Sequence, residues 1–346
     1  MRSKALAAGT LLAVSTWVVL PAGGQPAPEP VAAPVPATDD PAELKRLWAQ
    51  QQDAERWEKG RLLKQIDDLQ VELAARGVLD YRKLDYASTD GLRIPAYLFK
   101  PLAMPAGKVP AVIYAHGGQH GQFRSRMVPR LAEFVRRGYV VLAPDYRSSS
   151  GYTMEFHDAA DYGGREIDDM LAARDFLAAM PGVDAQRIAI IGESHGGYNT
   201  LMALARAPER FAAGVDFFGP TDLVWRLTAS PGENPNAEPG DREVFARMVG
   251  RSIDEAPELY RARSPRYLAT ASGPPLLILH GDKDAIVSIR ESAWMAEALE
   301  KAGRKNFSFH VIHDGQHGYP RPQMDEAWRL AYDFLDRVFG GQAPGG

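Results

Sequence analysis

One strand–turn–helix segment limits the folds open to this chain more than any other feature. The isoleucine-rich run 188–191 predicts a buried strand, and the Ala- and Leu-bearing segment after the motif below has helical spacing. Between them Gly192, Ser194 and Gly196 form a G-x-S-x-G motif, in which the serine occupies a sharp strand-to-helix turn. Glycine suits the flanking positions because the backbone is crowded there and a side chain would collide with a neighbouring element. The segment therefore predicts a nucleophile at Ser194, with the amides of the following helix directed at it.

Strands and helices alternate along the chain from residue 109 onward. Such alternation predicts an α/β fold, with a mostly parallel central sheet and helices on both of its faces. In sheets of this kind a ligand site lies at the carboxyl ends of the strands. An N-terminal helix over 41–75 and an antiparallel hairpin over 82–100 are expected before the alternating part. The later strands are expected at residues 111–115, 139–143, 188–191, 213–217, 275–279 and 307–312.

Two further residues supply the chemistry that Ser194 would need. Asp284 follows the expected strand at 275–279, and His317 follows the one at 307–312. The chain order serine, acid, histidine is the order of the α/β-hydrolase fold. A serine hydroxyl is a weak nucleophile until a histidine accepts its proton, and a carboxylate holds that imidazole in the required tautomer. We therefore expect Ser194, Asp284 and His317 to meet at one edge of the sheet.

The acid and the histidine each have a competitor on the same loop. Asp282 competes with Asp284, and we favour Asp284 because it lies further from the strand end and is followed by apolar residues that can anchor the loop. His313 competes with His317, and we favour His317 because nearby glycines let the loop turn back toward the serine.

Other polar residues at the strand ends are interpreted as structural. Asp145 and Arg147 are expected to form a buried pair that fixes the loop after their strand, in preference to a substrate-binding pair. His280 is expected to form hydrogen bonds that hold the acid loop, which is the loop that carries Asp282 and Asp284. Histidines spaced three or four residues apart occur in two places, but neither set lies on one helix, so no metal site is expected.

The composition argues against several classes of function. The net charge of −4 at pH 7 gives no sign of the clustered cations on which nucleic-acid binding relies. The sequence contains no Walker loop and no G-x-G-x-x-G motif, so no nucleotide cofactor is expected. It also lacks cysteine, which excludes disulfides and thiolate metal sites. A peptide or small ester substrate is the expected partner, and no cofactor is expected.

The N-terminal region predicts the compartment and the domain organisation. Residues 1–24 combine two basic residues, an apolar run and a Pro-Ala-Gly-Gly end, which is typical of a secretory signal peptide. An uncleaved membrane anchor is the less favoured alternative, because the apolar run is short and contains Ser and Thr. We expect a secreted or periplasmic protein with no stable membrane insertion after cleavage. The Pro- and Ala-rich stretch 25–40 predicts a linker, followed by the helical segment 41–75 and a catalytic domain over 81–340.

Several linked motifs resemble, in order, the catalytic domain of the prolyl oligopeptidase family of serine peptidases. They are Pro144–Tyr152, Gly192–Tyr198, Ser264-Pro265, His280–Val287 and Gly315–Gly318. The resemblance runs from roughly Tyr81 to Phe339. It implies that Ser194 is the nucleophile, Asp284 the acid and His317 the base. In some family members a tyrosine hydroxyl helps to bind the oxyanion from the position matched here by His116. The remaining oxyanion donors that the resemblance implies are the backbone groups of His195, Gly117 and Gly118.

The chain departs from the family pattern at its N-terminal side. Family members usually carry a β-propeller that filters peptides, and in exopeptidases it binds the substrate amino group through glutamates; only about forty residues stand in its place here. Three hypotheses follow. The family resemblance favours a peptidase or amidase, and the missing propeller favours a carboxylesterase without peptidase activity. The third is a non-catalytic binding protein on a hydrolase scaffold, which the intact serine, acid and histidine disfavour.

Overall fold

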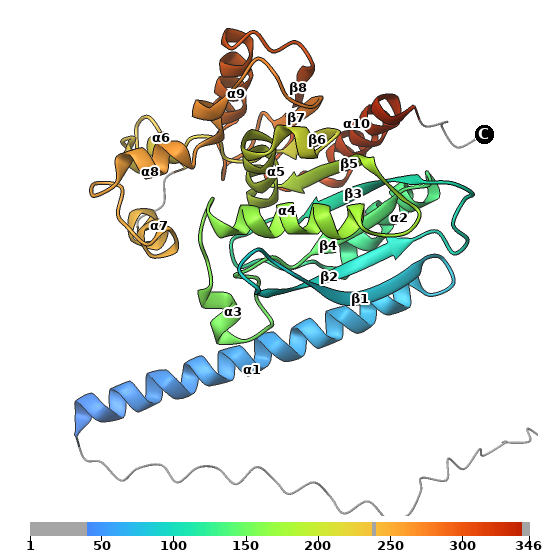
Figure 1. The fold of residues 1–346 in the computed structure, drawn as a ribbon. Coiled ribbons are helices and arrows are strands. Elements are labelled where there is room, and N and C mark those ends of the chain that lie inside the picture. Colours follow the sequence, from blue (N-terminus) through green and yellow to red (C-terminus); the bar gives the residue numbers. More distant parts are fainter. Residues whose placement is uncertain (1–39, 237–239, 341–346) are drawn as a thin grey trace, which may run out of the picture. The chain divides into compact units, whose positions relative to one another are not determined.

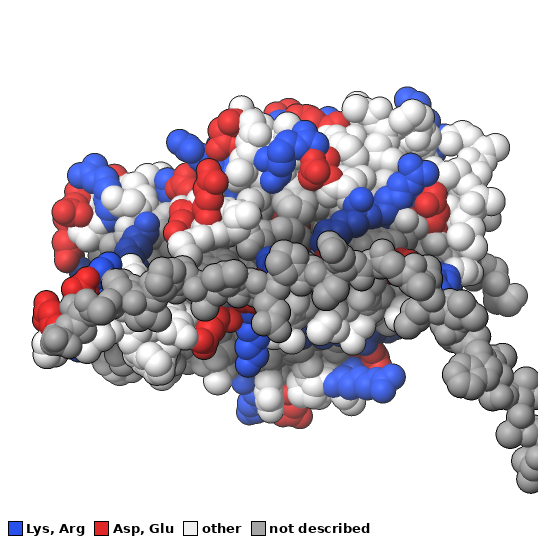
Figure 2. All heavy atoms as spheres, turned by 90° about the horizontal axis from the view of Figure 1, so that it is seen from below, with Lys and Arg blue, Asp and Glu red and all other residues white. Residues whose placement is uncertain are grey.

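A computed structural model of the protein describes residues 40–236 and 240–340 (Figure 1). The expected signal peptide (1–24) and all but the last residue of the expected linker lie outside the described residues. Among the described residues, no helix has the length and apolar character needed to cross a bilayer. Acidic and basic side chains are interspersed on the part of the surface that Figure 2 leaves visible.

Within the described chain, eight strands form one sheet in the order β1-β2-β4-β3-β5-β6-β7-β8. β1 and β2 form an antiparallel hairpin, β2 pairs antiparallel with β4, and all other neighbours are parallel. The expected α/β-hydrolase fold with a mostly parallel sheet is thus confirmed. The strands are β1 (Asp80–Ala87), β2 (Arg93–Lys100), β3 (Val109–Ala115), β4 (Val140–Pro144), β5 (Val183–Glu193), β6 (Ala213–Phe217), β7 (Leu276–Gly281) and β8 (Phe307–Ile312).

Helices cover both faces of this sheet (Figure 1). The apolar side chains of α4, α5 and α9 join one buried cluster, and those of α2, α10 and the end of α1 join a second. The helices are α1 (Pro41–Ala75), α2 (Val128–Arg136), α3 (Met154–Asp158), α4 (Arg165–Ala178), α5 (His195–Arg206), α6 (Leu223–Thr228), α7 (Asp241–Val249), α8 (Pro257–Ala262), α9 (Ile289–Lys301) and α10 (Arg321–Phe339). Short 3₁₀ turns lie at η1 (Ser125–Met127), η2 (Pro208–Arg210) and η3 (Pro265–Leu268).

The central strands are largely apolar because both of their faces are buried. In β3, Ile113 belongs to one cluster and its neighbours Val112 and Tyr114 to the other. This alternation follows from the two-residue period of a strand, and burial on both faces is why parallel strands read as continuous apolar runs. β5 begins at Val183, earlier than the isoleucine run, and its pairing with β3 is irregular between Val109 and Ala111.

The C-terminal half of α1 docks on the body of the protein through buried charges. The side chain of Lys64 is 2% exposed, and its Nζ lies 2.8 Å from the carboxylate of Asp145, which follows β4. Gly151 makes room for this contact, because a Cβ there would lie 2.6 Å from the Cβ of Lys64. One helical turn further, Asp67 accepts hydrogen bonds from the backbone N–H and the hydroxyl of Ser125. This part of α1 therefore holds two loops that follow strands of the sheet.

The expected pairing of Asp145 with Arg147 is wrong, although both side chains are buried. Asp145 pairs with Lys64, whereas Arg147 pairs with Asp169 of α4 at 2.7 Å and with Asp90 at 3.0 Å. The two side chains leave the loop toward different helices, and each meets an opposite charge from a distant part of the chain. Because these partners lie far apart in the sequence, local motifs could not predict the pairs.

Candidate active site

Ser194 occupies a strained turn between the end of β5 and the start of α5. Its φ is 55° and its ψ is −117°, a conformation that non-glycine residues rarely adopt and that costs about 1–3 kcal/mol. The flanking glycines are sterically required. A Cβ at Gly192 would lie 2.2 Å from the carbonyl oxygen of Gly196, and one at Gly196 would lie 2.0 Å from that of Ala115. The tight G-x-S-x-G turn thus carries the serine above the sheet edge.

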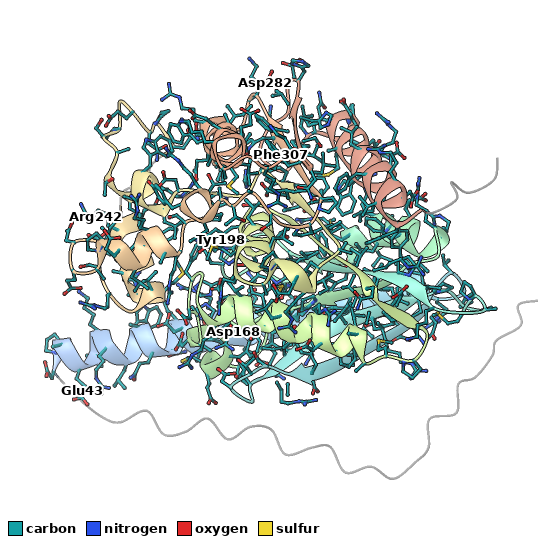
Figure 3. All side chains as sticks on the ribbon, turned by 45° about the horizontal axis from the view of Figure 1, so that its top comes forward. Glu43, Asp168, Tyr198, Arg242, Asp282 and Phe307 are labelled. Atoms are coloured by element: carbon teal, nitrogen blue, oxygen red, sulfur yellow. The ribbon has the colours of Figure 1, made fainter. Side chains whose placement is uncertain are left out.

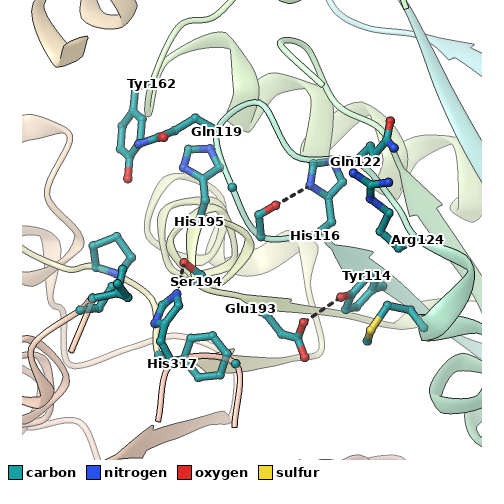
Figure 4. Close-up of a pocket in the computed structure, with 18 of the residues that line it drawn as sticks. Tyr114, His116, Gln119, Gln122, Arg124, Tyr162, Glu193, Ser194, His195 and His317 are labelled. Atoms are coloured by element: carbon teal, nitrogen blue, oxygen red, sulfur yellow. Dashed lines mark hydrogen bonds between the residues drawn. The ribbon is translucent and has the colours of Figure 1, made fainter. Parts of the chain in front are cut away.

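The structure brings Ser194, His317 and Asp284 into one hydrogen-bonded line. Ser194 Oγ lies 2.9 Å from His317 Nε2 (Figure 4). His317 Nδ1 lies 2.8 Å from Asp284 Oδ2. Since a carboxylate accepts at Nδ1, that nitrogen carries the proton and Nε2 is left to accept from the serine hydroxyl. The edge of the Phe218 ring packs against the imidazole with ring centres 4.8 Å apart. The three groups thus have the connectivity that activates a serine.

The loop after β7 holds Asp284 in its ionised form. Burial opposes ionisation, but hydrogen bonds with His280 and His317 and one from the backbone of Val287 outweigh it and hold the pKa of Asp284 well below its usual range. The Val287 N–H donates to the Asp284 Oδ1 at 2.9 Å, and His280 Nε2 lies 3.0 Å from the Val287 carbonyl oxygen. His280 therefore braces the acid loop as expected.

Asp282 lies away from the imidazole of His317. Its carboxylate accepts from the backbone N–H of Asp314 at 2.8 Å and faces His313 Nδ1 at 3.3 Å, so it ties the loop after β7 to the loop after β8. In Figure 3, Asp282 lies at the edge of the protein, whereas Tyr198 of α5 lies in the interior. Of the two competing acids, the structure places Asp284 beside His317.

His195, Gly117 and Gly118 line the pocket next to the serine. His195 is the first residue of α5, where the amides have no acceptor within the helix. Gly117 packs directly against the turn that carries Ser194, since a Cβ on Gly117 would lie 3.5 Å from the Ser194 Cβ. In the described part of the chain, the N–H groups of Gly117 and Gly118 donate no backbone hydrogen bond. These groups are therefore available to a developing oxyanion.

The ring of His116 is turned into the protein. Its Nε2 lies 2.9 Å from the Ser149 hydroxyl, and the ring stacks on Tyr146 with centres 4.3 Å apart. Burial lowers the pKa of His116 to about 4, so the imidazole is neutral at pH 7. This ring is occupied by contacts inside the loop and does not reproduce the tyrosine hydroxyl found at its position in some family members.

The serine opens into a pocket of about 410 Å³ whose lining includes residues that motif reasoning missed. Glu193 precedes the nucleophile, and its carboxylate accepts from the Tyr114 hydroxyl at 3.0 Å. Arg124 and Arg126 come from the loop after β3. Glu193 could have been noticed as the variable residue of G-x-S-x-G, but the arginines lie in a loop without a motif. Within the described residues, no group of three or more His, Asp or Glu side chains is arranged to hold a metal ion.

Comparison with known proteins gives the family. A family model described as "Prolyl oligopeptidase family" matches residues 126–342, which include Ser194, Asp284 and His317. Dipeptidyl peptidase family member 6 of Caenorhabditis elegans is 30% identical over 288 residues, covering 75% of this chain and 38% of the relative. Dipeptidyl aminopeptidase BIII of Pseudoxanthomonas mexicana is 31% identical over 271 residues, covering 75% of this chain and 39% of the relative.

Solved structures give the same fold. A puromycin-hydrolyzing peptidase of Mycobacterium tuberculosis superposes with a TM-score of 0.69 at 23% identity, covering 77% of this chain and 40% of that one. The match thus spans about two fifths of the length of these two curated relatives. Both the family model and the relatives lead to one assignment: the chain belongs to the prolyl oligopeptidase family, in its α/β-hydrolase part.

Proposed function

We propose that the protein is a secreted serine hydrolase that cleaves peptide, amide or ester bonds by acyl transfer. Ser194 attacks the substrate carbonyl while His317 Nε2 takes the serine proton. Asp284 holds the imidazole in the reactive tautomer and stabilises the imidazolium that forms. The backbone groups of His195, Gly117 and Gly118 bind the oxyanion.

The leaving group then departs with the proton that His317 received. Water enters, His317 accepts one of its protons, and the resulting hydroxide equivalent breaks the ester between the acyl group and Ser194. Each proton taken by the imidazole is thus returned, once to the leaving group and once to the serine. No cofactor is needed for either half of the reaction.

One observation carries this proposal: the unbroken line from the Ser194 hydroxyl through His317 to Asp284, at 2.9 and 2.8 Å, on a strained turn that opens into a pocket. A structural serine needs neither the strained backbone nor the pocket. The names of the curated relatives, a dipeptidyl peptidase and a dipeptidyl aminopeptidase, support peptide bonds as the substrate class.

A fluorophosphonate probe tests the proposal. The wild-type protein should be labelled at Ser194, because the probe reacts only with an activated serine. Ser194→Ala should abolish labelling, whereas Ser272→Ala, a control at an exposed serine remote from the pocket, should retain it. Retained labelling of Ser194→Ala would refute the assignment of the nucleophile.

Matched substrates separate peptidase from esterase. Short acyl esters and the corresponding aminoacyl p-nitroanilides present the same acyl group to Ser194 with leaving groups of different reactivity. A peptidase should cleave both, whereas a carboxylesterase should cleave only the esters. Fractionation of a bacterial host that expresses the full chain tests secretion, and protein retained in the cytoplasm would contradict it. N-terminal sequencing of the exported protein tests cleavage of the expected signal peptide, and a chain that still begins at Met1 would contradict that cleavage.

A further inference from the structure

The pocket beside Ser194 has two chemically different walls. One includes the aromatic residues Tyr162 and Phe245, and the other includes Arg124 and Arg126. Figure 4 shows Tyr162 and Arg124 on different sides of Ser194. Aromatic rings suit a substrate side chain or acyl group without charge, whereas guanidinium groups suit an anion. The arginine wall has no part in the acyl-transfer steps above.

The backbone presents both arginines to the same side. Arg124 is extended, with φ −124° and ψ 142°, and directly precedes the 3₁₀ turn η1 that contains Arg126. Both arginines line the pocket. Phe123 and Met127 are buried, and Ser125 is partly buried, whereas Arg124 and Arg126 are exposed. The apolar anchors and the serine thus face the protein, and the two arginines face the pocket.

Polar contacts hold this segment in place. The Ser125 hydroxyl donates to Asp67 of α1 at 2.6 Å, and the Phe123 N–H donates to Asp145 at 2.5 Å. The side-chain oxygen of Gln122 accepts from the Arg124 guanidinium at 2.9 Å when its amide nitrogen donates to the Ser150 carbonyl oxygen. Because these contacts fix the segment before a ligand arrives, less entropy is lost when a ligand binds.

Neither arginine has a carboxylate within ion-pair distance in the part of the chain that the structure describes. The third arginine of the pocket, Arg226, differs, because it lies 3.6 Å from Glu291. Glu193 is the acidic residue on the arginine wall. Burial raises its pKa, and the hydrogen bond from Tyr114 and the charge of Arg126 oppose that rise. Two arginines thus face one carboxyl group. The wall therefore keeps a cationic excess in a protein whose net charge is −4.

The cationic character continues beyond the pocket. Arg126 and Met127 also line an adjoining open depression of about 840 Å³, in which arginines outnumber acidic residues. Arg130 in this depression pairs with Asp325, so part of its charge is neutralised. Arg136 and Arg137 likewise pair with Glu133, and Arg329 pairs with Asp333. Arg321 also lines the depression and has no ion pair among the described residues. A substrate leaving the pocket past Arg126 would therefore meet a surface on which most cations are paired and Arg321 is not.

We propose that Arg124 and Arg126 are specificity-determining residues that bind a carboxylate of the substrate close to the bond that Ser194 attacks. The inference rests on the proposed function. A guanidinium binds a carboxylate by two parallel hydrogen bonds, and these charge-assisted bonds are stronger than neutral ones. The carboxylate can belong to the acyl part, as in an acidic side chain, or to the leaving part, as in a free peptide C-terminus.

Two pairs of substrates test the inference and distinguish these sources. The first compares the p-nitrophenyl monoester of glutaric acid with p-nitrophenyl pentanoate, which differ in a carboxylate on the acyl part. The second compares trialanine with trialanine amide, which differ in a carboxylate on the leaving part. For each pair the measured quantity is the ratio of kcat/KM for the charged member to that for the neutral member. The proteins are the wild type, the double variant Arg124→Gln/Arg126→Gln and the control Arg290→Gln, an exposed arginine on α9.

In at least one pair, the wild type should prefer the charged member by about tenfold or more. The double variant should lose most of that preference, and raised ionic strength should weaken it in the wild type. Arg290→Gln should keep the wild-type ratio. The pair that responds identifies which part of the substrate carries the carboxylate.

A wild-type ratio near one in both pairs, or a ratio that the double variant leaves unchanged, would overturn the inference. Fluorophosphonate labelling is measured on the same samples, so that this failure can be told from failure of the proposed function. Labelled protein without an arginine-dependent preference refutes only the role of Arg124 and Arg126. Wild-type protein that is folded but unlabelled refutes the proposed function as well.

Discussion

Two polar assemblies in this protein use the same kinds of contact for different ends. Ser194, His317 and Asp284 are joined at 2.8–2.9 Å, and Lys64 and Asp145 are joined at 2.8 Å. The imidazole of His317 is 22% exposed and reaches the pocket, whereas the Lys64 and Asp145 side chains are 2% and 0% exposed. Short contacts between buried polar groups therefore do not mark a reactive site by themselves.

The difference lies in what remains available to a ligand. Asp145 accepts from the Phe123 N–H and the Tyr152 hydroxyl in addition to its contact with Lys64, so its oxygens are saturated by the protein. Ser194 has a strained backbone and open space beside it, and among the described residues its hydroxyl has one hydrogen-bond partner. Lys64 and Asp145 form a closed assembly, which fixes loops. Ser194, His317 and Asp284 form an open assembly on a strained turn, which can react with a ligand.

Removing the serine hydroxyl should separate the two assemblies most clearly. Ser194→Ala is expected to lower kcat by about a million-fold, as loss of the nucleophile does in other triads. Its melting temperature should stay close to that of the wild type, because the backbone and the buried pairs are unchanged. Parallel measurements of ester hydrolysis and thermal unfolding check this, and a large fall in melting temperature would mean that the hydroxyl has a structural role.

The acid loop offers a matched pair of variants. Asp284→Asn should lower kcat by roughly ten-thousandfold, because an amide at this position favours the wrong tautomer of His317. Asp282→Asn should cost far less, since Asp282 contacts the neighbouring loop and not the imidazole of His317. If Asp282→Asn were the more damaging substitution for kcat, the acid would be misassigned.

Substitution in the closed assembly should lower the stability of the protein, whereas substitution in the triad lowers its activity. Lys64→Met leaves the Asp145 carboxylate buried without its cation, and breaking such a pair is expected to lower the free energy of unfolding by about 3–5 kcal/mol. Lys59→Met, on an exposed position of the same helix, is the control and should change it little. Urea unfolding checks both. Equal stability of the two variants would contradict the anchoring role of Lys64.

Asp216 gives a third kind of buried carboxylate, one without a cationic partner in the described chain. Its Oδ1 accepts from the Gly219 N–H at 2.9 Å, its Oδ2 has no partner there, and burial raises its pKa to about 7. Because the folded pKa exceeds the unfolded value of about 3.9, its contribution to stability is complete below pH ~4 and is lost as pH rises through 7. Asp216→Asn should therefore flatten the decline in melting temperature between pH 5 and pH 8, and an unchanged decline would contradict this assignment.

Local sequence patterns were enough to predict the fold and the positions of the loops around the pocket. The apolar runs of the central strands report burial on both faces, and the glycines around Ser194 report the crowding that the structure shows. The choice of Asp284 over Asp282 rested on loop length and an apolar anchor, and the structure places Asp284 beside His317.

Contacts between distant parts of the chain could not be predicted in this way. The partner of Asp145 lies on α1, where Lys64 falls in a helix rich in other charged residues and nothing local marks it as buried. Arg124 and Arg126 face the pocket only because Phe123 and Met127 are anchored in the protein, which depends on the packing of several elements. Such pairings are decided by tertiary structure, and no pattern within a short window reports them.

The most direct test of the central claim is to capture the covalent intermediate. The protein is mixed with p-nitrophenyl acetate, quenched in acid within the first turnover, digested and analysed by mass spectrometry. If Ser194 is the nucleophile activated by His317 and Asp284, one acetyl group should be found on the peptide that contains Ser194, and His317→Ala should fail to accumulate it. Hydrolysis without any acetylated peptide, or with the acetyl group on another residue, would contradict the claim.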